Sequence, residues 1–146
     1  MPDWLHTPMT VAGRILLALM FVLAGVGKLA NIDGTAGFMA SAGLPASPAL
    51  VVLVGLGELL AGLAVATGFM ARWAALGLAV FTLSVSFIFH RYWAVPDEQQ
   101  MVQQLLFMKN MGVAGGMLVL AALGPGPASL GKRRRSSPGG GPNPAR

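Results

Sequence analysis

The chain has no cysteine among its 146 residues, and only 10% of its residues carry a charge. Without cysteine there is no disulfide, no thiolate metal ligand and no thiol relay within this chain. The low charge accompanies 55% hydrophobic residues and a mean hydropathy of +0.68. These values exclude an ordinary soluble domain and predict a small integral membrane protein.

Acidic residues are scarce, with five Asp and Glu against ten Lys and Arg, which gives a net charge of +5. A basic chain can bind nucleic acid, but four of its ten basic residues form the run 132–135 directly after the last apolar stretch. A basic run in that place is typical of a stop-transfer and orientation signal. We therefore expect the lipid bilayer as a partner and no nucleic acid.

Histidine is also rare, and this limits cofactor chemistry. A haem held by two histidines needs facing ligands at membrane depth, and one of the two histidines, His6, precedes the first apolar stretch. No nucleotide-binding loop is present, and Glu58 is the only acid inside an apolar stretch. The methionines of the last stretch are typical of core packing. We expect no metal site and no intrinsic cofactor.

Four apolar stretches organise the chain, at residues 11–30, 48–68, 71–89 and 101–123. Each approaches the ~20 residues that cross a ~30 Å hydrocarbon core as a helix, and a helix satisfies its own backbone in lipid. The sequence predicts an all-α membrane protein, an antiparallel bundle of four transmembrane helices. It has a cytoplasmic segment 1–10, a transmembrane domain 11–124 and a disordered basic tail 125–146.

The connections differ in length. Residues 31–47 form the longest one, where we expect a short interfacial helix, whereas residues 69–72 are a tight hairpin connection. A cleaved signal peptide is an alternative interpretation of the first stretch. Lys28 directly after its apolar run and Asp3 before it argue against cleavage.

The distribution of Lys and Arg predicts the orientation. Arg14, Arg72 and the run 132–135 lie on the side of the termini, and mainly Lys28 and Arg91 lie on the other side. Cytoplasmic flanks are enriched in such residues, so both termini are expected in the cytoplasm.

Four ionisable residues lie within or at the ends of the apolar stretches: Lys28, Glu58, His90 and Lys109. Each costs roughly 2.5–3.5 kcal/mol in hydrocarbon, so it must pair, line a wet cavity or do chemistry. We predict that Glu58 pairs with Lys109, with Lys28 as the reserve partner. Purely structural roles stay open: the pair can fix helix register, Lys28 can reach the head groups, and His90 can be interfacial.

Small residues accompany the ionisable ones at helical spacing, which lets neighbouring backbones approach closely. In the second stretch Glu58 shares a face with Gly55 and Gly62, and in the first Lys28 shares one with Phe21 and Gly25. In the last stretch Lys109 shares a face with Gly112 and Gly116. The polar faces are therefore also predicted packing faces.

The order and spacing of these residues resemble the DoxX-like family, four-helix bacterial membrane proteins related to the DoxD subunit of thiosulfate:quinone oxidoreductase. The resemblance covers nearly the whole bundle. Its elements in this chain are Arg14, Gly25-Val26-Gly27-Lys28-Leu29, Gly43-Leu44-Pro45, Glu58 with Gly62, Gly68, Arg72, His90 and Lys109-Asn110.

The resemblance implies an integral subunit of a quinone-linked, or sulfur or oxidative-stress related, redox system in the bacterial cytoplasmic (inner) membrane. Quinone is then the expected cofactor, and a redox protein or a second copy the expected partner. Glu58 and Lys109 are the candidate catalytic proton relay, and Lys28, His90 and Asn110 the candidate substrate-binding residues. A non-catalytic membrane anchor and a small transporter are the alternatives.

Overall fold

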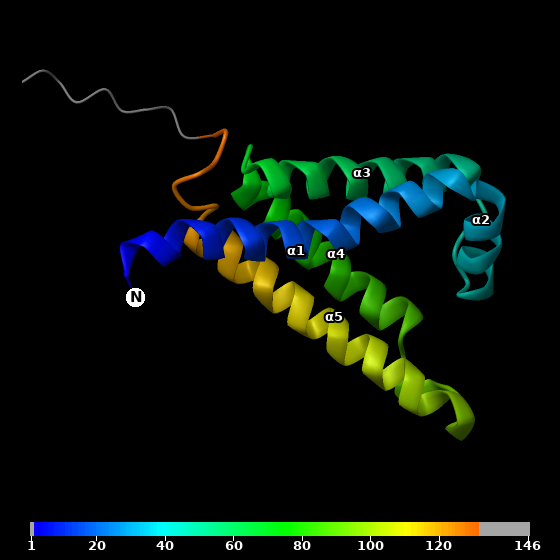
Figure 1. The fold of residues 1–146 in the computed structure, drawn as a ribbon. Coiled ribbons are helices and arrows are strands. Elements are labelled where there is room, and N and C mark those ends of the chain that lie inside the picture. The colour runs from blue at the N-terminus through cyan, green and yellow to red at the C-terminus, as the bar shows by residue number, and fades with distance from the viewer. Residues whose placement is uncertain (1, 132–146) are drawn as a thin grey trace, which may run out of the picture.

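The structure, a computed structural model, describes residues 2–131, and the regular structure of these residues is all helical, without a strand. Four helices are long and apolar enough to cross a membrane, which confirms the predicted all-α architecture (Figure 1). The predicted tail beyond residue 131 lies outside the described residues. The elements are α1 Asp3–Ala30, α2 Ile32–Ser41, α3 Pro48–Thr67, α4 Ala71–Phe89, the 3-10 helix η1 Tyr92–Ala94, and α5 Asp97–Leu123.

Local chemistry sets the helix ends. Ser47 caps α3 by accepting a hydrogen bond from the backbone N–H of Leu50 at 3.3 Å, and proline follows it at the first helical position. Gly68, with a φ of 80°, ends α3 in the left-handed conformation that glycine adopts without steric cost. Because α4 begins only three residues later, the predicted tight hairpin connection is confirmed.

Helix α2 confirms the short helix expected between the first two spans. Its start is capped by Asn31, whose side chain accepts a hydrogen bond from the Gly34 N–H at 3.1 Å. Figure 1 shows α2 at the end of the α1–α3 pair that lies away from the N-terminus. Its buried Ala36 and Met39 form an apolar cluster with Val51 of α3, so α2 covers that end of the molecule.

Helices α1 and α3 pack very closely through glycine. A Cβ atom on Gly25 of α1 would lie 2.6 Å from the Gly55 carbonyl oxygen of α3. A Cβ atom on Gly62 would lie 3.0 Å from the side chain of Val22. Gly55, Glu58 and Gly62 are all buried, which confirms the predicted packing face of the second span.

Helices α4 and α5 form the second antiparallel pair. Near one end, Arg72 Nε donates to the Ala121 carbonyl at 2.9 Å; near the other, His90 Nδ1 lies 2.9 Å from Gln103 Oε1. Figure 1 shows that the two helix pairs meet near the N-terminus and diverge towards α2. Side chains of all four long helices share one buried core at the end near the N-terminus, which is therefore the closed end of the bundle.

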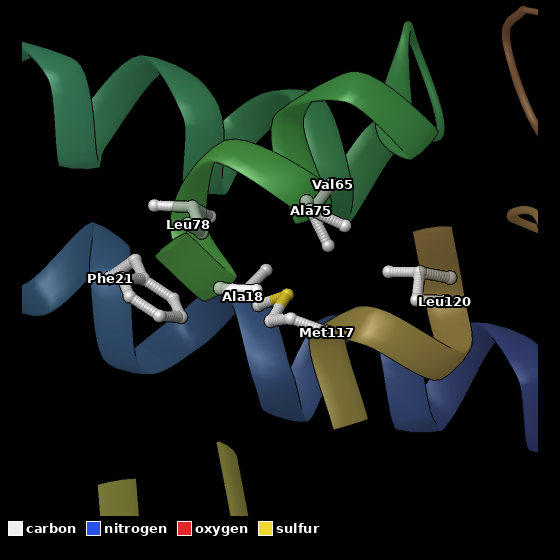
Figure 2. Packing of buried hydrophobic residues seen from close by; sticks show 8 residues of the cluster. Ala18, Phe21, Val65, Ala75, Leu78, Met117 and Leu120 are labelled. Carbon is white, nitrogen blue, oxygen red and sulfur yellow. The ribbon is translucent and has the colours of Figure 1, made fainter. Parts of the chain in front are cut away.

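The main apolar core lies at that closed end, where all four long helices contribute side chains (Figure 2). Its buried members are Ala18, Phe21, Val65, Ala75, Leu78, Ala79, Met117 and Leu120. Met117, which is fully buried, packs in this cluster with Ala18 of α1 and with Ala75 and Ala79 of α4. Lys28 and Glu58 lie outside this core.

Arg14 holds residues 125–131 against the bundle. The side chain is 5% exposed and donates to the carbonyls of Ala66, Pro125 and Ala128 at 3.0, 2.8 and 2.9 Å. The backbone N–H of Leu130 donates to the Thr67 carbonyl. Residues 125–131, which the sequence predicted as the start of a disordered tail, are thus hydrogen-bonded to α1 and α3, because a buried guanidinium needs acceptors.

Replacing Arg14 by Met should release residues 125–131 from the bundle. Hydrogen bonds to a charged group contribute about 1.5–3 kcal/mol each, and Met retains only the apolar stem. We expect the Leu130 amide to exchange its hydrogen at least about tenfold faster, as measured by mass spectrometry. Arg91→Met, at an exposed position, is the control. Unchanged exchange in Arg14→Met would show that these bonds do not hold the segment.

Candidate functional site

The ion pair in the interior joins Lys28 of α1 to Glu58 of α3, with Nζ 2.6 Å from Oε2. Among the described residues no salt bridge joins Glu58 to Lys109, so the predicted pair is wrong and the reserve partner Lys28 takes its place. The physical reason is the helix pairing. Helix α1 packs along α3 through glycine, whereas α5 packs mainly against α4 and leaves Lys109 exposed.

The two charges are unequally buried, since the side chain of Glu58 is 6% exposed and that of Lys28 is 27% exposed. Glu58 is held in the middle of α3 by the close helix contact, while the longer Lys28 side chain reaches it from the last turn of α1. Glu58 Oε2 is buried and lies against Lys28 Nζ. The second carboxylate oxygen, Oε1, is therefore the one left to accept a hydrogen bond from a ligand.

A cavity of about 370 Å³ lies beside this ion pair. Its size falls within the range of small-molecule pockets, which are mostly apolar with a few placed polar groups. The polar side chains are Lys28, Glu58, His90, Thr35 and Ser84. The apolar ones are Phe38, Met39, Leu44, Leu50, Val54, Phe81, Val85, Ile88 and Phe89.

His90 lines the cavity from the end of α4. Its Nδ1 lies 2.9 Å from Gln103 Oε1. With that amide oxygen as the acceptor, Nδ1 carries the proton and donates, and Nε2 of the neutral ring is the remaining acceptor. Gln103 of α5 thus sets the tautomer of a histidine in the candidate site.

The cavity brings together three of the five predicted site residues, namely Lys28, Glu58 and His90. Lys109 is exposed and Asn110 is buried, and neither lines this cavity. The hydrogen bonds at both ends of the α4–α5 pair fix the register of the two helices. In that register Asn110 of α5 lies at the depth of Thr82 of α4. The buried hydroxyl of Thr82 has no partner among the described residues. Asn110 therefore belongs to the helix contact.

The predicted set missed Thr35 and the α4 face formed by Phe81, Ser84, Val85 and Ile88. These four α4 residues follow one another at helical spacing, so they share one side of the helix. That spacing around a serine in an apolar span is a signal that the sequence offers. Thr35 offers none, because its place depends on how α2 folds back over α3.

A second, more polar cavity of about 270 Å³ adjoins the first at the α2 end, and it is lined by Arg91, Gln99, Gln103 and Ser41 among others. Phe38 and Phe89 line both cavities, and their rings stack with centroids 5.1 Å apart. The aromatic pair therefore separates a polar vestibule from the cavity with the ion pair. Within residues 2–131, no three His, Asp or Glu side chains gather as metal ligands would.

The arrangement defines a four-span membrane protein with a charged pair beside an interhelical cavity. Residues 9–91 match the DoxX family, and these residues include every side chain that lines the cavity. The chain belongs to the DoxX family.

Two similar proteins are both named as inner membrane proteins of Escherichia coli (strain K12). Inner membrane protein YqjF is 40% identical over 120 residues, covering 82% of this chain and 87% of that protein. Inner membrane protein YphA is 33% identical over 120 residues, covering 82% and 86%. No solved structure matches the chain.

Proposed function

We propose that this protein is the membrane-embedded subunit of a redox system and that the cavity beside Lys28 and Glu58 binds the ring of a quinone. The observation that carries the proposal is a mostly apolar cavity in whose lining Lys28 and Glu58 lie together as an ion pair. A quinone ring is apolar on both faces and polar only at its oxygens, so it matches such a lining.

The chemistry assigned to each side chain follows from its hydrogen-bonding capacity. Lys28 Nζ donates to a quinone carbonyl, and Glu58 Oε1 accepts from the hydroxyl of the reduced form. Reduction of the quinone takes up two electrons and two protons. The electrons come from the cofactor of a partner protein, and Glu58 relays protons. Lys109, which forms no salt bridge with Glu58 among the described residues, has no part in this step.

The proposal places the α2 end at the outer face of the bacterial inner membrane, with both termini in the cytoplasm. It is supported by the Lys and Arg bias and by the names of the two relatives. In intact cells, an impermeant thiol reagent should label a Ser41→Cys variant in α2 and leave a Ser136→Cys variant unlabelled. Labelling of the tail alone would reverse the orientation.

Quinone binding is testable with a matched pair of histidine variants. In lipid nanodiscs, His90→Leu should bind a short-chain ubiquinol about tenfold more weakly, the equivalent of the one hydrogen bond that a quinol hydroxyl donates to His90 Nε2. His6→Leu removes an exposed histidine that lies outside the cavity and should bind as the unmodified protein does. Equal affinity in all three proteins would exclude His90 from the site, and no binding at all would refute the quinone proposal.

Lys109 favours a second candidate function, that of an anchor for a partner protein. It is an exposed cation in an apolar helix, and the exposed Gly112, three residues further on, leaves room for a neighbouring helix. As an anchor contact, Lys109→Met should lower accumulation of the protein in its native membrane without changing quinone affinity. A loss of quinone affinity instead would place Lys109 in the binding function.

A further inference from the structure

A groove of about 520 Å³ runs between α3 and α4 next to the cavity. The two spaces share the side chains of Val54, Glu58 and Phe81. Glu58 is the only charged residue in the lining of the groove. The groove therefore leads from the carboxylate of the ion pair along an apolar path.

Glycine and large side chains give the groove its shape. A Cβ atom on Gly57 of α3 or on Gly77 of α4 would meet nothing within 4 Å. Leu53 and Trp73, also in its lining, are 68% and 72% exposed. Both belong to helices that are apolar enough to span the membrane, so the groove opens on the surface that faces lipid chains.

We propose that this groove holds the hydrocarbon chain of the ligand whose polar head lies beside Lys28 and Glu58. The ligand class is then a membrane-dissolved amphiphile with one long chain, such as a prenylated ring. This inference rests on the proposed function and narrows it. Its support is the continuity of the two spaces at Glu58.

A small water-soluble anion fits this geometry less well. It would leave the apolar groove unused, and from the polar vestibule it would have to pass the stacked rings of Phe38 and Phe89. A chain-bearing ligand enters sideways from the lipid instead. It brings the head to the ion pair without crossing the aromatic pair.

Filling the groove tests whether the hydrocarbon chain and the polar head of the ligand are bound in separate spaces. Gly77→Leu places a side chain in the open space of the groove. Gly112→Leu on α5 is the matched control, because a Cβ atom there also meets nothing within 4 Å. Two probes are compared in nanodiscs by native mass spectrometry: a ubiquinone with a single isoprene unit and a long-chain ubiquinone.

We expect Gly77→Leu to weaken binding of the long-chain probe about tenfold or more, whereas binding of the short-chain probe stays within about twofold. Gly112→Leu should change neither. Gly57→Leu, on the other helix of the groove, should repeat the result of Gly77→Leu and so exclude an effect peculiar to one variant.

Three outcomes overturn the inference. If Gly77→Leu and Gly57→Leu bind both probes normally, the chain lies elsewhere, as it would if a partner helix filled the groove. If both variants lose both probes equally, head and chain are not held in separate spaces. If the unmodified protein binds neither probe, the proposed function itself has failed. If the unmodified protein does bind the short-chain probe, either of the first two outcomes overturns only the inference about the groove.

Discussion

Lys28→Met should lower the free energy of unfolding by about 3–5 kcal/mol, the range observed when one partner of a buried ion pair is removed. The reason is that Glu58, 6% exposed, would be left in the interior without its partner cation. Lys109→Met makes the same chemical change at an exposed position and should alter stability by less than about 0.5 kcal/mol. Thermal unfolding of both purified variants in one detergent compares them directly.

The double variant Lys28→Met with Glu58→Gln tests whether the loss arises from the unmatched charge. It should recover much of the stability that Lys28→Met loses, because no charge then remains buried alone. Equal losses in Lys28→Met and Lys109→Met would contradict the assignment of the pair. An unrecovered double variant would mean that Lys28 acts through its packing.

Gly25→Leu should prevent α1 and α3 from packing. Even a Cβ atom at Gly25 would lie 2.6 Å from the Gly55 carbonyl oxygen and 2.8 Å from the Leu59 nitrogen. Both of these are backbone atoms that cannot turn away as a side chain can. We expect the free energy of unfolding to fall by at least about 3 kcal/mol, which is at or above the upper end of the range for overpacked core sites. Size-exclusion chromatography and thermal unfolding in detergent would report the loss.

Gly27→Leu is the matched control for that prediction. It lies on the same helix two residues further on, and a Cβ atom there meets nothing within 4 Å. It should fold as the unmodified chain does. If both variants are equally stable, the two helices do not depend on the glycine contact for their close approach.

The helices and their packing faces were predictable because each leaves a local signal. Apolar length gives the spans, and the positions of Gly55 and Gly62 beside Glu58 give the buried face of α3. The partner of Glu58 was not predictable in this way. Depth and face are properties of one helix, whereas an ion pair depends on which helices are neighbours, and α3 lies against α1.

The cavity shows the same limit. Lys28, Glu58 and His90 could be selected as unusual residues in apolar spans. That they line one space follows from the way α2 folds back over α3 and from the divergence of the two helix pairs (Figure 1). The prediction that residues 125–131 are disordered was wrong for a related reason. Their Gly and Pro content is typical of disorder, and the hydrogen bonds that Arg14 donates to Pro125 and Ala128 leave no signal in the sequence.

In the proposed orientation, Arg14 serves the chain at two different times. A helix takes its orientation while it is being inserted, under the influence of flanking Lys and Arg. At that moment α5 and the residues after it have not been synthesised, so the guanidinium is still a free positive charge. In the finished protein the same group is buried against three carbonyls, two of which belong to residues 125–131. A lysine would carry the early signal equally well, but it lacks the planar fork of donors that the later contacts use.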